Sequence, residues 1–174
     1  DLRGTWRIGA HTLDAGLHHD RYQLKSVTYG TTAAPIADWL LSDTGTLNTN
    51  SYGKTQTDAL YLQDAWQLRP DWRLVAGARQ ERWRAFDGSN YSAANVSPNP
   101  KNIVYGDRSV SNVSPKLSLS WQTTPTLSLR AALGKGVRYP TVAEMFQTFN
   151  GPNNIRTNDP NLKPEQVNSQ EWVL

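Results

Sequence analysis

Apolar and polar residues alternate with a period of two in segment after segment of this chain, whereas helical periodicity is weak throughout. In DWRLVAGARQERW (71–83), every second residue from Trp72 to Ala78 is apolar. The same alternation recurs in KLSLSW (116–121) and TLSLRAALGKGVR (126–138). Because successive side chains of a strand point to opposite faces, these segments predict β-strands with one apolar and one polar face.

Further strands are expected at 11–24, 57–68 and 167–174, although the two faces of 57–68 are too similar to assign. The connections between strands alternate in length. RPD (69–71) and QTTPT (122–126) are short enough for tight turns. The other connections, 25–57, 86–114 and 139–165, run to about 30 residues, far above the usual length in compact domains, and are expected to be polar loops with little core.

Short turns on one side and long loops on the other are typical of an outer-membrane β-barrel. A soluble β-sandwich can also carry uneven loops, so a binding module of that kind, for instance one that recognises carbohydrate, is the alternative. Trp66, Trp72 and Trp121 all lie beside the short turns, at one common height. They form either an interfacial aromatic girdle or the core aromatics of a sandwich.

Composition removes several classes of protein. The chain has no cysteine, so disulfides and thiolate metal sites are excluded, and its 18 Lys and Arg residues form no basic run of the kind that binds nucleic acid. No apolar run approaches the roughly 18 residues of a membrane-spanning helix. Adjacent His18 and His19 point to opposite faces of a strand, and no catalytic motif is present. We therefore expect no metal, no cofactor, no nucleic-acid partner and no enzymatic activity.

Three stretches of the chain together resemble the barrel of TonB-dependent outer-membrane receptors. They are LYLQDAWQLRPDWRLVAGARQERW (60–83), SPKLSLSWQTTPTLSLRAALGKGVRYPTVAEMFQ (114–147) and NDPNLKPEQVNSQEWVL (158–174), and the similarity runs from about Thr57 to the C-terminus. The resemblance implies an all-β fold of antiparallel up-and-down strands, forming part of a large transmembrane barrel with long extracellular loops. Residues 1–174 would then be a partial barrel, with the plug domain and the remaining strands absent.

The resemblance also implies a location and partners. The protein would reside in the bacterial outer membrane in contact with its lipid, and the TonB complex would engage a missing N-terminal region. Its activity would be to bind and import a scarce nutrient, and a ferric siderophore is the favoured one. In haem-transporting relatives, segments that match VRYP (137–140) and DPNL (159–162) flank a loop histidine, and no histidine lies between them here.

In the family, the stretch that matches GVRYPTVAEMF (136–146) ends a strand at the cell surface and begins an extracellular loop, and DPNLKPE (159–165) leads back to the next strand. Pro140 has no amide hydrogen to add to a ladder, so pairing should end there. Charged residues of the strands are expected to face the lumen and contact the plug: Arg73, Arg79, Glu81, Lys116, Arg130, Arg138 and Glu171. Aromatic and Arg residues of the loops are the candidates for ligand contact: Trp39, Tyr52, Tyr91, Tyr105, Phe149 and Arg156.

Overall fold

The computed structural model describes residues 1–30, 46–93, 102–150 and 155–174. Its main feature is one antiparallel sheet whose strands follow the order β1-β2-β3-β4-β6-β7-β10, with β5 paired to β4. The strands are β1 (Leu2–Ile8), β2 (His11–Gly30), β3 (Thr46–Arg69), β4 (Trp72–Ser92), β5 (Asn102–Val104), β6 (Arg108–Thr124), β7 (Leu127–Arg138) and β10 (Glu165–Val173). Chain neighbours pair along most of the sheet, which confirms the predicted up-and-down antiparallel fold.

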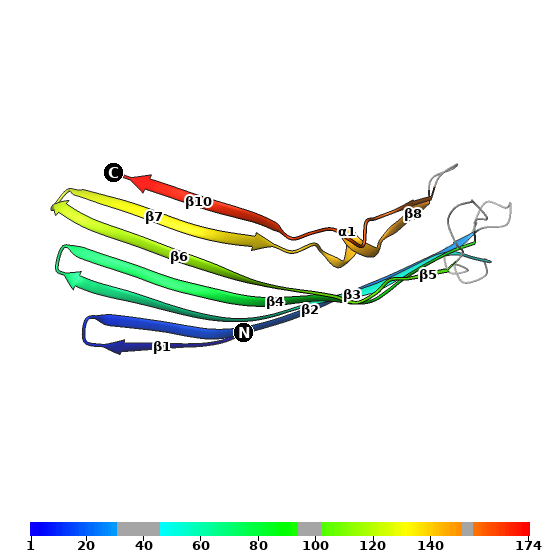
Figure 1. Ribbon diagram of the computed structural model, residues 1–174, viewed down its shortest axis with the longest axis horizontal. Helices are drawn as coiled ribbons and strands as arrows, with labels where there is room; N and C mark the ends of the chain where they lie inside the picture. Colours follow the sequence, from blue (N-terminus) through cyan, green and yellow to red (C-terminus); the bar gives the residue numbers. More distant parts are fainter. Residues whose placement is uncertain (31–45, 94–101, 151–154) are drawn as a thin grey trace, which may run out of the picture.

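Three two-residue turns lie at one end of the sheet, on the left of Figure 1, and join β1 to β2, β3 to β4 and β6 to β7. The first turn contains Gly9 at φ +59°, a conformation that costs glycine little. The other two contain Pro70 and Pro125, as the short connections predict. At the opposite end the chain continues into α1 (Val142–Phe146) and a small hairpin of β8 (Thr148–Asn150) and β9 (Ile155–Thr157).

The expectation of long loops is wrong for much of 25–57 and 86–114. Strand β2 runs on to Gly30 and pairs with β3 from Thr46, while β4 continues to Ser92. These extensions carry polar residues on both faces, so they lack the alternation by which a half-buried strand is recognised. A hydrogen-bonded ladder needs only a paired neighbour, because its bonds are made by the backbone. The first strand, β1, also went unpredicted.

The pairing register sorts the side chains of the sheet onto two faces. Trp72 pairs with Trp121, which pairs with Leu129, and Leu74 pairs with Leu119. We call the face that carries these residues the outer face, and the opposite face, which carries Arg73 and Arg130, the inner face. Within the described residues no second sheet covers the outer face, so the soluble-sandwich alternative is not favoured. No helix in the described part of the chain has the length and apolarity to cross a membrane.

The buried core lies on the inner face, at the end of the sheet away from the tight turns. Strand β7 stops at Arg138, just before Pro140, and the chain then turns into α1. The buried side chains of Met145 and Phe146 from α1 pack against Trp83 and Ala85 of β4. The Phe146 ring lies directly over Gly53 of β3 and Gly88 of β4, where any larger residue would collide with it. In Figure 1, α1 accordingly lies beside β3 and β4 although it follows β7 in sequence.

Candidate functional site

The outer face carries an apolar band whose two edges differ. The edge next to the tight turns, which we call the lower edge, is aromatic: the Trp72 and Trp121 ring centroids lie 4.9 Å apart in a stack, and His11 stacks on Trp66 at 5.0 Å. Its upper edge is charged: Arg82 of β4 and Asp58 of β3 are directly opposite each other in the strand register. Ten residues separate Trp72 from Arg82, which is ~33 Å along a strand and ~25 Å in height at a tilt of about 40°. That height fits the apolar band of an outer-membrane barrel.

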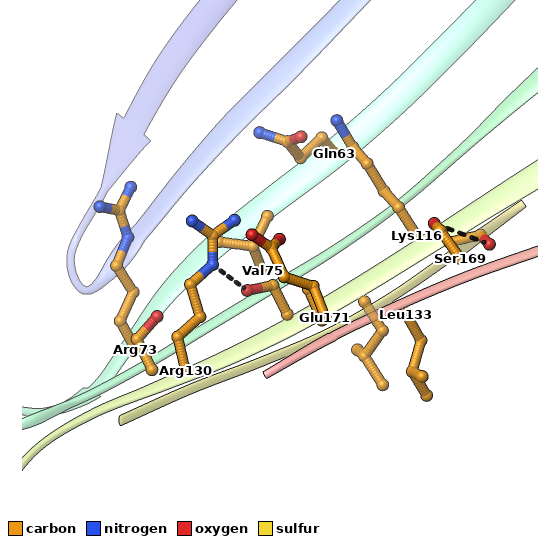
Figure 2. Close-up of a pocket in the computed structure, with 13 residues that line it drawn as sticks. Gln63, Arg73, Val75, Lys116, Arg130, Leu133, Ser169 and Glu171 are labelled. Carbon is orange, nitrogen blue, oxygen red and sulfur yellow. Dashed lines mark hydrogen bonds between the residues drawn. The ribbon is translucent and has the colours of Figure 1, made fainter. Parts of the chain in front are cut away.

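Charged and polar side chains of five strands gather on the inner face around a hollow of about 670 Å³. Figure 2 shows the side chains of Arg73, Lys116, Arg130 and Glu171 extending to the same side of the sheet, whereas Leu133 points to the other side. Arg130 Nε donates a hydrogen bond to Ser118 Oγ at 3.2 Å. The sequence alternation therefore brings four of the seven expected inner charges to one place.

A second hollow on the same face adds two more of the expected charges. Arg79 and Glu81 form an ion pair in which Nε and Oε1 are 2.8 Å apart. They line this hollow together with Arg3 and Asp14, whose side chains are themselves joined at 3.1 Å. These partners were not predicted from the sequence, because no alternation marks β1, the strand that carries Arg3. The sequence signal for this site was Asp14, which alternates with Leu13 and Ala15 and therefore lies on the polar face of β2.

The seventh charge, Arg138, lies at the end of β7 and bonds two carboxylates. Its guanidinium contacts Glu144 of α1 and lies 3.3 Å from Oε1 of Glu165, the first residue of β10. Thr141 and Glu144 form a capping box at the start of α1. The Thr141 backbone amide, which donates to Glu144 Oε2 at 2.8 Å, and the Arg138 guanidinium hold the pKa of Glu144 below its usual value. Arg138 therefore ties the strand end to both the helix and the returning strand.

The predicted ligand-contact residues do not gather on one face. Tyr105 lies on the inner face, where its hydroxyl accepts a hydrogen bond from Asn90 Nδ2 at 3.0 Å and its ring is 5.7 Å from Phe146. Tyr52 and Tyr91 lie on the outer face, because their strand neighbours Ser51 and Asn90 are buried on the inner one. Lys54 Nζ lies 5.3 Å from the centroid of the Tyr52 ring.

The remaining ligand candidates are placed only by their backbone or not at all. Phe149 of β8 pairs with Arg156 of β9 in the small hairpin after α1. Trp39 lies outside the described residues. The structure thus places Tyr105 against the buried residues of α1. It places Phe149 and Arg156 in the β8–β9 hairpin that follows α1 in the chain.

A second tyrosine, Tyr139, packs against the same buried core as Tyr105 and was not predicted as a site residue. Tyr139 stacks on Trp83 with ring centroids 5.8 Å apart, and its hydroxyl accepts a hydrogen bond from Asn112 Nδ2 at 3.2 Å. Burial raises the pKa of the Tyr139 phenol, so the hydroxyl stays protonated and is a hydrogen-bond donor at neutral pH. The signal that pointed to it was its place before Pro140, where the chain must leave the ladder. We call Trp83, Tyr105, Tyr139 and Phe146 the aromatic cluster.

The histidines bind carboxylates in separate places. His18 and His19 lie on opposite faces of β2, as adjacent strand residues must. His18 Nε2 lies 3.0 Å from Asp20 Oδ2, and His19 Nδ1 lies 2.6 Å from Asp58 Oδ1. Among the described residues no group of three His, Cys, Asp or Glu side chains has the arrangement of a metal site.

Comparisons with known proteins agree with this architecture. A family model described as "TonB dependent receptor-like, beta-barrel" matches residues 1–171. A solved structure, "Copper transporter OprC", matches with a TM-score of 0.64 and 20% sequence identity over 98% of this chain. The chain spans only 25% of the length of that structure. No curated protein matches the sequence.

Proposed function

This chain belongs to the TonB-dependent receptor β-barrel family, and we propose that the complete protein binds a scarce nutrient at the cell surface and imports it. The family resides in the bacterial outer membrane, which is the location of this chain. In the proposal, the outer face contacts lipid and the inner face lines the lumen. Energy for release of the nutrient comes from the TonB complex through a region that does not belong to this barrel segment.

The two-faced sheet is the observation that carries this proposal. An open sheet with a band of exposed Leu and Trp on one face is unstable in water, while the other face carries Arg73, Lys116, Arg130 and Glu171. Such a sheet suits a wall between lipid and a polar interior. We further propose that the charges around the two inner hollows contact a plug domain inside the barrel, since paired charges and hydrogen-bond donors suit a protein surface.

We propose a ferric siderophore as the nutrient. The loop histidine of haem-transporting relatives has no counterpart between VRYP and DPNL, which argues against haem at this loop. The aromatic cluster lies beyond the apolar band, on the face that would line the mouth of the lumen. Trp83 and Phe146 of this cluster are buried, so the half-buried Tyr105 and Tyr139 are its members available to a ligand. Their phenols and the exposed Arg138 guanidinium suit an anionic, partly aromatic chelate. The copper named for OprC is the cargo of that protein, and a likeness at 20% identity carries only the fold.

Uptake by cells that carry the full-length gene tests this proposal. A deletion strain expressing the wild type should take up one radiolabelled ferric siderophore from a panel that also contains haem, cobalamin and Cu²⁺. Tyr105→Phe, which removes only the hydroxyl, should lower the affinity for that chelate about tenfold. Tyr91→Phe is the matched control, because Tyr91 lies on the outer face, and it should have no effect.

Two outcomes would refute parts of the proposal. Uptake of haem, cobalamin or Cu²⁺ alone would overturn the siderophore assignment and leave the transport role. Equal effects of the two tyrosine substitutions would instead show that the aromatic cluster does not contact the ligand.

A further inference from the structure

We propose that Asn112 and Gln166 orient the hydroxyl group of Tyr139, so that it donates a hydrogen bond to an anionic oxygen of the imported nutrient. In this proposal Tyr139 contacts the nutrient, while Asn112 and Gln166 are positioning residues that act through it. The inference rests on the proposed transport function and adds to it the chemical group that the site accepts.

The three side chains meet where the sheet is divided. The ladder between β6 and β7 ends at the pair of Lys116 and Gly134, although β6 begins at Arg108 and β7 continues to Arg138. Pro115, the next residue of β6 toward its start, has no amide hydrogen with which to extend the ladder. Beyond this point β6 pairs with β4 and β7 pairs with β10, so side chains make the connection across the division.

Two hydrogen bonds join these side chains in series. Gln166 Nε2 donates to Asn112 Oδ1 at 3.2 Å, and Asn112 Nδ2 donates to the Tyr139 hydroxyl at 3.2 Å. Gln166 lies in β10, Asn112 lies in β6, and Tyr139 directly follows the end of β7. Because the carbonyl end of Asn112 accepts from Gln166, its amide end faces the phenol. The phenol oxygen is therefore an acceptor within the protein, and its own proton remains available for donation.

The Tyr139 hydroxyl is protonated and fixed in direction. Burial raises the pKa of the Tyr139 phenol, so the proton stays on the oxygen at neutral pH. Stacking on Trp83, with ring centroids 5.8 Å apart, sets the direction of the C–O bond. Within the part of the chain that the structure describes, this hydroxyl forms one hydrogen bond, which it accepts from Asn112. An oriented donor of this kind fits an acceptor atom of a bound molecule, and a charged acceptor binds it most strongly.

A second tyrosine on the same core repeats part of this arrangement. Asn90 Nδ2 donates to the Tyr105 hydroxyl at 3.0 Å, so the Tyr105 phenol also keeps a proton to donate. Asn90 Oδ1 is buried without a partner among the described residues, so a third side chain fixes the carboxamide only at Asn112. Two phenol donors favour a ligand with several acceptor oxygens, such as carboxylate, catecholate or hydroxamate groups.

The orientation of the Tyr139 hydroxyl can be measured without any nutrient. The complete protein in detergent is labelled with ring-¹³C tyrosine, and the infrared spectrum of Tyr139→Phe is subtracted to isolate the C–O stretch of Tyr139. The wild type should show the frequency of a phenol that accepts. In Asn112→Asp, compared with its own Tyr139→Phe version, the band should move to that of a phenol that donates, because a carboxylate can only accept.

Binding to the same detergent-solubilised protein tests the ligand class. The probes are a ferric tris-catecholate, a ferric tris-hydroxamate and ferric citrate, with cobalamin as the neutral comparison, and the chelate that binds most tightly is used for the variants. Tyr139→Phe and Asn112→Asp should each weaken binding about tenfold, and Gln166→Ala about threefold. The double variant of Tyr139→Phe and Asn112→Asp should bind no more weakly than either single one, because Asn112 acts through Tyr139.

Asn168→Asp is the matched control for the added charge. Asn168 lies two residues from Gln166 in β10, opposite Lys135 of β7, and forms no hydrogen bond with the Tyr139 hydroxyl. It should change the affinity less than about twofold. A loss equal to that of Asn112→Asp would show a general effect of charge and overturn the inference.

Three further outcomes would overturn the inference at separate points. A donor frequency for Tyr139 in the wild type would show the opposite orientation of the Asn112 amide. Additive losses in the double variant would show that Asn112 does not act through Tyr139. Binding of cobalamin alone would refute both the anionic ligand class and the siderophore assignment, whereas the infrared result would still decide the orientation of the hydroxyl.

Discussion

The half of the sheet next to the tight turns and the half beyond the Arg82–Asp58 row share one backbone ladder, yet they are stabilised by different surroundings. In the first half, apolar residues such as Leu60 and Leu62 are exposed on the outer face, which contacts lipid in the proposed placement. In the second half, Trp83 and Phe146 are buried within the protein on the inner face. The main apolar group therefore changes face along the same strands, from the outer face in the apolar band to the inner face at the core around Phe146.

This reversal explains why α1 is needed. Beyond the bilayer, a strand that turned its apolar residues outward would expose them to water, so these residues turn inward and require a cover. Helix α1 supplies that cover with Met145 and Phe146, and Ser51 Oγ accepts a hydrogen bond from the Thr148 amide at 3.1 Å just after it. Changes to the two halves should therefore have separable effects.

Removing the buried ring of Phe146 should have the largest effect. Phe146→Ala would leave a cavity over Gly53 and Gly88 and destabilise the docking of α1 by about 3–5 kcal/mol. Hydrogen exchange at the amides of α1 should rise to the rate of an undocked segment, while the strands next to the tight turns stay protected. The control is Phe86→Ala, on the outer face of the same strand region. Unchanged exchange in α1 would contradict the assignment of Phe146 to its core.

An arginine in the apolar band should have the next largest effect. Leu62→Arg places a charge near the middle of the band and should destabilise the folded barrel by about 2–4 kcal/mol in lipid vesicles. Gln63→Arg is the matched control one residue away, on the inner face, and should be nearly neutral. Denaturant unfolding in vesicles measures both. Equal losses would mean that the two faces do not differ in their surroundings.

Loss of the helix cap should have a smaller effect, confined to the second half. Thr141→Ala removes the hydroxyl that accepts from the Glu144 amide at 3.2 Å and should destabilise α1 by about 1 kcal/mol. The exchange rates of the α1 amides should rise modestly, and Thr141→Ser should restore them. A change in the unfolding midpoint of the whole barrel would show instead that the two halves are coupled.

Acid should weaken α1 by the smallest amount. The pKa of Glu144 is lowered in the folded state, so its contribution is fully present above the pKa of an unfolded glutamate. That contribution is lost as the pH falls from the unfolded value through the folded one. Exchange of the α1 amides, corrected for its intrinsic pH dependence, should rise in this window, and Glu144→Gln should flatten the profile. A rise on the alkaline side would contradict this sign.

The alternation of apolar and polar residues predicted the strands wherever one face of a strand is apolar and the other is polar. The alternation at 71–83, 116–121 and 126–138 correctly predicted the parts of β4, β6 and β7 that lie in the apolar band. The same rule fails in the extensions of β2, β3 and β4, because polar residues occupy both faces there. It also could not separate Tyr105 from Tyr91, whose faces depend on a change of register near Asp87, a residue at φ 56°.

The sequence by itself determined the strands of the band, the tight turns and the end of β7 just before Pro140, because each depends on side chains close in the chain. Only the tertiary structure decided that α1 crosses to β3 and β4, since the contact of Phe146 with Gly53 joins residues far apart in sequence. It likewise decided that Gln166, Asn112 and Tyr139 meet, because strand register and the end of the β6–β7 ladder set which side chains are neighbours.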